Sequence, residues 1–330
     1  MDSRLDAAAS VGALAGRRIL VVGDLILDHY LEGLVERVSP EAPVPVVTLS
    51  RDAERSLPGG AANVAMNIRS LGSLPVSAGL VGDDEHGRLL RSLLSAAGAD
   101  VSCVLTDAGR PTTTKTRIMA RHQQILRIDR EVSDPASPGV AAELERAVMG
   151  ALDSVDAVVF EDYDKGCIHP GLVAEVISAA AARGIPVAVD PKFRNFRAYR
   201  GCSLLKPNRS EASRFTGMEI GDSAQASGAA AKILSETGSE AVLLTLGEQG
   251  AVLVEKGGIP ILIPAAARRV FDVSGAGDTV ISVMALAIAA GMPLRLAALL
   301  ANYAAAAVCA EPGVYAVKPA DILREIDAGA

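Results

Sequence analysis

The sequence contains no tryptophan, and aromatic residues make up only 3% of its 330 residues. Its four cysteines lie far apart and form no pair with metal-site spacing, and the four histidines are equally scattered. These patterns exclude a disulfide framework and a compact cysteine or histidine metal centre. We expect reduced, buried or indifferent thiols in a cytoplasmic protein.

The chain also lacks an excess of positive charge, because its formal net charge is −7. Such a protein as a whole has no electrostatic footprint for nucleic acid or for an anionic membrane, so an anionic ligand needs a local cationic cluster. The first 16 residues carry acidic groups and no basic segment followed by an apolar core, which does not fit a signal peptide. We therefore expect no nucleic-acid or membrane partner.

One apolar stretch, residues 280–310, is long enough to cross a bilayer. Gly291-Met292-Pro293 interrupts it in the middle, where a helix ends at glycine and does not resume before proline. The sequence therefore predicts two buried helices of a globular core.

The apolar half of the composition consists mainly of Ala, Val, Leu and Ile, which suits buried strands flanked by alanine-rich helices. From residue 140 onward strands and helices alternate, as in strand 156–160, helix 170–182 and strand 187–189. Two other segments, 29–49 and 111–130, carry alternating strand patterns with prolines and break this rhythm. We expect an α/β fold with a small β-sheet lid over its edge.

The stretch Asp272-Val-Ser-Gly-Ala-Gly-Asp-Thr279 opens the long apolar run. Its two glycines let backbone N–H groups at a helix start converge on an anion. Asp278 then lies beside that anion, where its carboxylate can serve as the base that accepts a proton from an attacking hydroxyl. The alternative is a glycine turn whose aspartate only favours the helix dipole.

Polar groups also follow the first strand and open the next helix. Asp24 and Asp28 come after the apolar run 18–23 and are candidates for binding sugar hydroxyls, although an acidic turn explains them as well. Gly59 and Gly60 precede an alanine-rich helix with Asn63 in its first turns. That pattern allows close approach to a ligand or, alternatively, tight packing on the sheet.

Four motifs occur in order along the chain: GGAANVAMN near residue 60, KPNRSE at 206, LTLGEQG at 244 and DVSGAGDT at 272. Together they resemble the ribokinase-like (PfkB) family of carbohydrate kinases from Arg17 to about Leu323. The resemblance implies a mostly parallel central sheet between helices with a small β lid. It places a kinase domain at 17–325, with residues 1–16 as an N-terminal extension.

Within this family the segments GDLILDHYLEGLVERVSPEAPVPVV, EDYDKG and TTKTRIMARHQQILRID are most similar to kinases of D-glycero-β-D-manno-heptose 7-phosphate. The implied reaction is ATP-dependent phosphorylation of the anomeric hydroxyl, which gives the 1,7-bisphosphate for ADP-heptose and lipopolysaccharide inner-core synthesis. The sequence ends without the HxGH motif of a fused nucleotidyltransferase and so resembles the stand-alone kinase form.

The resemblance also implies roles for individual residues. Asp278 is the expected base, and the N–H groups of Gly275, Ala276 and Gly277 stabilise the transferred phosphoryl group. The nucleotide-binding candidates, with Glu211 acting indirectly on Mg²⁺, are Asn208, Glu211, Thr245, Gly247, Gly250, Ser274 and Asn302. The sugar-binding candidates are Asp24, Asp28, Gly59, Gly60 and Asn63, and the cations available for the sugar phosphate are Arg117, Arg121, Lys165 and Lys192.

Several alternatives stay open at this point. Asn302 is equally explained as a polar residue that satisfies local backbone, and the two arginines as solvated surface charges. ATP and Mg²⁺ are the implied cofactors, and the segment 311–315 leaves K⁺ dependence open. Paired β lids favour a homodimer. The competing functions are another sugar or sugar-phosphate kinase of the family and a non-catalytic sugar- or nucleotide-binding regulator.

Overall fold

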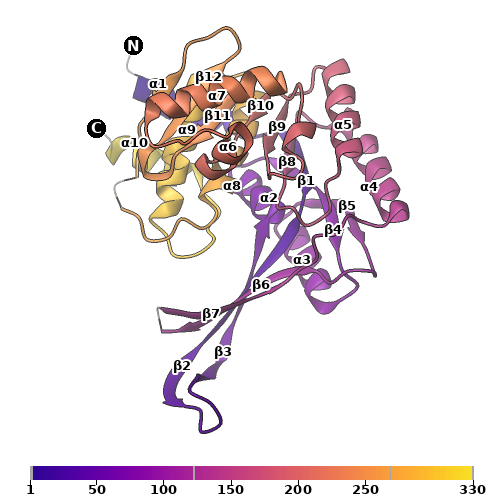
Figure 1. Ribbon diagram of the computed structural model, residues 1–330, viewed down its shortest axis with the longest axis vertical. Helices are drawn as coiled ribbons and strands as arrows, with labels where there is room; N and C mark the ends of the chain where they lie inside the picture. The colour runs from indigo at the N-terminus through magenta and orange to yellow at the C-terminus, as the bar shows by residue number, and fades with distance from the viewer. Residues whose placement is uncertain (1–2, 122, 268, 329–330) are drawn as a thin grey trace.

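The computed structural model describes residues 3–121, 123–267 and 269–328. Its main body is a nine-stranded sheet with helices on both faces (Figure 1). In spatial order the strands are β13 (Ile261–Ile263), β12 (Ala251–Glu255), β11 (Ala241–Thr245), β10 (Leu204–Leu205), β9 (Val187–Asp190), β8 (Ala157–Glu161), β1 (Arg18–Gly23), β4 (Leu74–Val81) and β5 (Asp100–Thr106). Only the pairings of β12 are antiparallel. The mostly parallel α/β fold predicted from the sequence is confirmed.

Both faces of this sheet are buried, because consecutive side chains of a strand point to opposite sides. In β1, Ile19 and Val21 join one apolar core and Leu20 and Val22 join the other. The first core is covered by α1 (Ser3–Ser10), α2 (Ala61–Ser70), α3 (Glu85–Ala96), α8 (Ala276–Ala289), α9 (Leu294–Cys309) and α10 (Pro319–Ala328). The second is covered by α4 (Pro138–Ala151), α5 (Pro170–Ala182), α6 (Arg209–Thr216) and α7 (Ser223–Thr237).

The apolar run after residue 276 forms two helices, as Gly291 and Pro293 predict. Helix α8 ends at Ala289 and α9 starts at Leu294, with Gly291 at a φ of +72° between them. Most of the α8 side chains are buried in the first core. Within the described ranges, no helix combines the length and hydropathy that a bilayer span requires.

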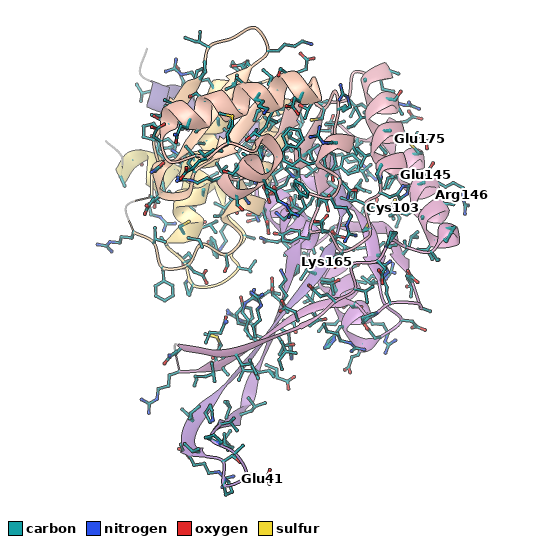
Figure 2. All side chains as sticks on the ribbon, viewed as in Figure 1. Glu41, Cys103, Glu145, Arg146, Lys165 and Glu175 are labelled. Atoms are coloured by element: carbon teal, nitrogen blue, oxygen red, sulfur yellow. The ribbon has the colours of Figure 1, made fainter. Side chains whose placement is uncertain are left out.

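A second sheet of four strands projects from the main body, in the order β3 (Pro45–Gly60), β2 (Leu25–Val38), β6 (Thr113–Ala120) and β7 (Gln123–Arg130) (Figure 1). Its far tip carries Glu41 (Figure 2). This sheet, here called the lid, is the small separate sheet of the expected fold class. Its strands reach further than the expected 29–49, because β2 continues directly from β1 and β3 runs up to the start of α2.

Residues 3–14, which we expected in an N-terminal extension, are helical. Ala7 of α1 and Val11 and Leu14 of the 3₁₀ helix η1 (Val11–Leu14) are buried in the first core. Helix α1 packs against α9 and α10, so the first and last helices lie on the same side of the molecule (Figure 1). These residues are therefore part of the main body and not a separate extension.

Candidate active site

The site is built on the carboxyl ends of adjacent parallel strands. The register pairs Gly23 at the end of β1 with Glu161 at the end of β8, and Glu161 with Asp190 at the end of β9. Lys206 directly follows β10, and its ammonium lies 2.7 Å from Asp190 Oδ2. One row of the sheet therefore brings two buried carboxylates and a buried ammonium to the edge where open α/β sheets bind ligands.

The amino end of α8 lies directly over this edge. Its cap, Gly275, has a φ of +79°, and a Cβ there would lie 2.8 Å from Asn63 Nδ2, so both backbone conformation and space demand glycine. A Cβ on Gly277 would lie 3.5 Å from Lys206 Nζ. The first-turn N–H groups of a helix have no partner within the helix, so this end can receive an anion. The Ala276 N–H donates to Val273 O over 3.2 Å, just before the helix.

Asp278 lies in that first turn and is held from two sides. Asn63 Nδ2 donates to its Oδ2 over 2.7 Å, and the Tyr163 hydroxyl donates to its Oδ1 over 2.8 Å. Burial raises the pKa of Asp278, and the same two hydrogen bonds oppose that rise. The Tyr163 hydroxyl is a firm donor because burial and the neighbouring Asp278 raise its own pKa well above the usual value. The carboxylate is thus fixed in direction.

Asp278 opens onto a pocket between the main body and the lid. The pocket brings together the predicted residues Asp28, Gly60, Arg117, Ser274, Gly275 and Asp278 and four that the sequence analysis did not select, Ile26, Lys115, Tyr163 and Val314. Gly59 lies just behind its wall, where a Cβ would come within 2.2 Å of Asp28 Oδ2. The glycine therefore makes room for the Asp28 carboxylate.

Two cations of β6 face this pocket, because residues two apart share one face of a strand. Arg117 donates to Asp28 Oδ1. Lys115 has its ammonium 5.2 Å from the centre of the Tyr163 ring, and burial lowers its pKa. Among the residues that the structure describes, no carboxylate forms a salt bridge with Lys115. A half-buried ammonium of this kind is suited to an anionic group of the ligand.

Asp24 is positioned differently from Asp28. It is 3% exposed, and its carboxylate accepts backbone N–H groups of Tyr163, Lys165 and Cys167. Burial, together with the neighbouring Asp162, raises the pKa of Asp24 to about 6, although these three donors oppose the rise. Asp24 therefore holds the loop after β8 and, with it, the ring of Tyr163.

The remaining cation candidates lie outside the residues that line the pocket. Lys165, near the base of the lid in Figure 2, is paired with Glu131 at 2.8 Å. Lys192 is paired with Glu211, and its ammonium lies 5.2 Å from the centre of the Tyr163 ring. Arg121 is exposed at the turn between β6 and β7, with a φ of +56°. The structure thus brings Lys192 close to the site and leaves Arg121 far along the lid.

The candidates for nucleotide binding lie beyond β10 and β11. Asn208 and Glu211 cap the start of α6 reciprocally, and Glu211 also accepts from Lys192, so both of its carboxylate oxygens are engaged. Thr245 bridges to Asn208, and the glycine turn that follows has Gly247 at a φ of +63° and Gly250 at +90°. Asn208 therefore contacts both Glu211 and Thr245, and the glycine turn comes just after Thr245.

Both the nitrogen and the oxygen of the Asn302 side-chain amide form hydrogen bonds with the backbone. It donates to Pro264 O over 2.8 Å and accepts from Ala266 N over 3.3 Å. It therefore holds the loop between β13 and α8, as its alternative interpretation proposed, and its predicted contact with adenine is not tested by these bonds.

The sequence reasoning missed Lys115, Tyr163, Glu161, Asp190 and Lys206 as site residues. Lys115 could have been predicted, because it lies two residues before Arg117 and alternate residues of a strand share one face. Glu161 and Asp190 each end a strand, but only the register shows that they are neighbours. Burial, with Asp190 and Asp278 nearby, raises the pKa of Glu161 well above its usual value.

Comparison with known proteins identifies the family of the chain. A model of the pfkB family of carbohydrate kinases matches residues 17–321. The bifunctional protein HldE of Caulobacter vibrioides is 45% identical over 311 residues, which are 94% of this chain and 63% of that protein. The HldE protein of Geobacter sulfurreducens is 43% identical over 93% of this chain and 62% of its own length. The chain thus spans less than two thirds of these relatives, and the stand-alone form stays a prediction.

Solved structures share the architecture. Ribokinase of Arabidopsis thaliana, complexed with ribose and ATP, has a TM-score of 0.70 and 23% identity, and the match covers 94% of this chain and 99% of that one. Phosphofructokinase-2 of Escherichia coli, in complex with potassium, has a TM-score of 0.76 and 21% identity over 96% and 99% of the two chains. The chain therefore belongs to the pfkB family of carbohydrate kinases and is a sugar kinase.

Proposed function

We propose that the chain uses ATP to phosphorylate D-glycero-β-D-manno-heptose 7-phosphate at its anomeric hydroxyl, giving the 1,7-bisphosphate. The observation that carries this proposal is the pocket in which the fixed Asp278 carboxylate faces the same space as the Lys115 ammonium and the Arg117 guanidinium. A neutral sugar needs a base but no cations, whereas a sugar phosphate needs both. The identity of the sugar rests on the likeness of the lid segments to those of heptose 7-phosphate kinases.

The sugar hydroxyls are assigned to the wall that Asp28 and the main chain at Gly60 provide. One oxygen of Asp28 accepts a hydrogen bond from Arg117 and the other lies beside Gly59. The Asp28 side chain also lines the pocket, where it can accept from a sugar hydroxyl. Asn63 is committed to Asp278, so we assign it the positioning of the base. We propose that Asp24 positions the loop after β8, because its carboxylate accepts three backbone N–H groups of that loop.

The chemical step follows from the surroundings of Asp278. The oxygen of the anomeric hydroxyl attacks the γ-phosphorus in line, and the bond from that phosphorus to the bridging oxygen breaks, so that ADP leaves. The hydroxyl proton passes to Asp278, and the N–H groups of Gly275, Ala276 and Gly277 receive the charge that develops on the phosphoryl oxygens. An ordinary aspartate, with a pKa of about 3.9, is a much weaker base than an alkoxide, so we expect late proton transfer and an orienting role before it. Tyr163 and Asn63 keep the accepting oxygens in place throughout.

Kinases of this fold use ATP and a divalent metal, and we propose Mg²⁺ as that metal. The triphosphate is assigned to the surface formed by Asn208, Glu211, Thr245 and the turn from Gly247 to Gly250, with Ser274 at the pocket side and Asn302 near the adenine. Glu211 has both oxygens engaged, which fits an indirect contribution to the metal. When bound, the metal neutralises phosphate charge. Because a structural relative was solved with potassium, K⁺ belongs in the assay buffer.

We further propose a homodimer formed through the lid. The lid face opposite Lys115 and Arg117 carries a row in which Leu31 pairs with Ile118 and Ile118 with Leu126, followed by Ile128 beside Thr116. Leu126 and Ile128 are about half exposed, at 51% and 50%. An apolar sheet face of this kind is suited to a second copy of the same lid. The reaction itself needs only ATP and the sugar phosphate, and we assign it to the cytoplasm.

Two other functions make different predictions. Another kinase of the family would prefer a different sugar or sugar phosphate. A non-catalytic regulator would have no need for a base held by two hydrogen bonds at a helix terminus. The second alternative is therefore disfavoured by the geometry of Asp278.

The substrate is tested with a panel of sugars in an ADP-release assay containing Mg²⁺ and K⁺. We expect D-glycero-β-D-manno-heptose 7-phosphate to give the highest kcat/KM, with the new phosphate on the anomeric carbon by ³¹P NMR of the product. Faster turnover of ribose, a nucleoside or a fructose phosphate would assign the chain to another branch of the family. No ADP release with any sugar would leave only the non-catalytic regulator.

Replacing the base tests its role. Asp278→Asn should keep the fold and ATP binding but lower kcat by roughly 10²-fold or more, because proton acceptance is lost while the hydrogen-bonding shape is similar. The matched control is Asp222→Asn, the same change at the cap of α7, where the carboxylate accepts from Gln225 N. Near wild-type turnover of Asp278→Asn would remove Asp278 from the chemistry.

The phosphate site is tested by Lys115→Met. We expect KM for the sugar 7-phosphate to rise roughly 10- to 100-fold, as for loss of one charged hydrogen bond, with little effect on the heptose that lacks this phosphate. Lys165→Met, which removes an ammonium already paired with Glu131, is the matched control. The reverse pattern, in which only Lys165→Met raises KM, would move the phosphate site to the strand ends.

The dimer is tested by mass measurement with light scattering. The wild type should have twice the 33.9 kDa mass of the chain, and the double variant Leu126→Glu with Ile128→Glu should be monomeric, because buried carboxylates oppose packing of two lids. Ile259→Glu changes an 82% exposed side chain outside the lid and should remain dimeric. A wild-type monomer, or an unchanged double variant, would contradict the lid interface.

A further inference from the structure

The side chain of Tyr163 lies between the lid and the proposed base. Tyr163 belongs to the loop after β8, and it lines the pocket together with Lys115 of the lid and Asp278 of α8. Its hydroxyl donates to Asp278 Oδ1, whereas the Lys115 ammonium lies 5.2 Å from the centre of its ring. One rigid side chain therefore contacts both the proposed base and a proposed phosphate-binding cation.

Tyr163 is anchored to the main body at three points. Its backbone N–H donates to Asp24 Oδ2 over 2.8 Å, and its hydroxyl donates to Asp278 over the same distance. The ammonium of Lys192, which is itself paired with Glu211, lies 5.2 Å from the centre of the ring. The ring is thus a fixed platform against which a side chain of the lid can be placed.

Lys115 takes its position from this ring. Within the described parts of the chain it forms no salt bridge with a carboxylate, and burial lowers its pKa. A cation over an aromatic face is attracted by the quadrupole of the ring, more strongly where water is excluded. The ring therefore holds the ammonium in one place without neutralising it, so the charge stays available for an anion.

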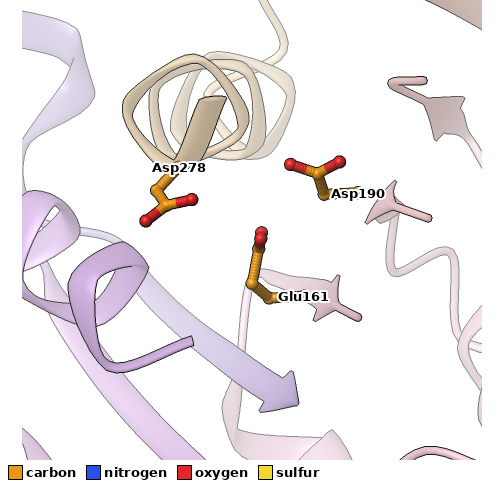
Figure 3. Close-up of side chains that lie close together, drawn as sticks. All are labelled: Glu161, Asp190 and Asp278. Atoms are coloured by element: carbon orange, nitrogen blue, oxygen red, sulfur yellow. The ribbon is translucent and has the colours of Figure 1, made fainter. Parts of the chain in front are cut away.

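Asp278 needs donors to fix its direction. The buried carboxylates of Glu161 and Asp190 lie close to it (Figure 3), and one oxygen of each of the three lies within 4.8 Å of the others. Neighbouring like charges repel, so a carboxylate in this position turns away unless hydrogen bonds hold it. Asn63 holds Oδ2 and the Tyr163 hydroxyl holds Oδ1. Of these two donors, Tyr163 is the one that also lines the pocket.

We propose that Tyr163 is a positioning residue that sets the spacing between the base and the phosphate-binding ammonium, with its hydroxyl directing Asp278 and its ring holding Lys115. A sugar phosphate fits only if its reacting hydroxyl and its phosphate are separated by that spacing. Tyr163 thereby selects substrates by the length of the carbon chain between these two groups. This inference rests on the proposed function, because it needs a sugar whose phosphate binds Lys115.

The test compares D-glycero-β-D-manno-heptose 7-phosphate with ribose 5-phosphate, which has an anomeric hydroxyl but a shorter carbon chain before its phosphate. Tyr163→Phe keeps the ring and loses the hydroxyl, so we expect kcat to fall about 10-fold or more while KM for the heptose phosphate stays within about 2-fold of the wild type. Tyr163→Leu also loses the ring. We expect its KM to rise at least about 5-fold, and its preference for the heptose phosphate, as a ratio of kcat/KM values, to fall by a similar factor.

Tyr315→Phe is the matched control. It removes a tyrosine hydroxyl that likewise donates to a carboxylate, Asp321 Oδ2, and both residues lie outside the set that lines the pocket. We expect the wild-type kcat, KM and sugar preference in this variant, because neither the base nor Lys115 loses a contact.

A Tyr163→Phe protein with the kcat of the wild type would overturn the inference, as would a Tyr163→Leu protein that keeps the wild-type KM and preference. Tyr163→Phe removes a single oxygen, and Tyr163→Met replaces Tyr163→Leu if the latter does not fold. A failure of the proposed function would appear in the wild type, as a lack of turnover of the heptose phosphate. A failure of this inference would appear only in the variants of an active wild type.

Discussion

The constraint on which the site depends is the register of the parallel sheet. Because β1, β8 and β9 end on one row, Glu161 and Asp190 are neighbours, and Lys206 enters the same row from β10. Helix α8 packs over these strand ends and begins at Gly275, where a side chain would meet Asn63. Sheet register and helix start together concentrate charge at a single point of the fold.

A chain of contacts leads from the strand ends to the proposed base. Asp24 fixes the loop after β8 through three backbone N–H groups, the loop presents Tyr163, and Tyr163 with Asn63 orients Asp278. The lid closes the other side with Lys115 and Arg117 on the strand face toward the pocket. In the proposed function the base comes from the main body and the phosphate-binding cations come from the lid, so a bound sugar phosphate would contact both parts.

Much of this could be read from the sequence, and the limits have physical causes. The βα rhythm after residue 140, the break at Gly291 and the glycine turn before Asp278 are local signals. They predict the fold class, which is confirmed, and the position of the proposed base. The acidic row is not local: Glu161 and Asp190 lie 29 positions apart in the chain, and only pairing makes them adjacent. Strand alternation places Lys115 with Arg117, and the pocket lies at their part of β6, whereas Arg121 lies beyond the end of that strand. Asp24 and Asp28 look alike in sequence, but Asp24 is engaged by backbone groups that no pattern reveals.

The most direct test of the account is a crystal structure with heptose 7-phosphate and a non-hydrolysable ATP analogue. The account predicts the anomeric oxygen within hydrogen-bonding distance of Asp278, in line with the terminal phosphorus, and the 7-phosphate against Lys115 and Arg117. A sugar whose anomeric oxygen lies away from Asp278, or whose phosphate contacts neither lid cation, would contradict it.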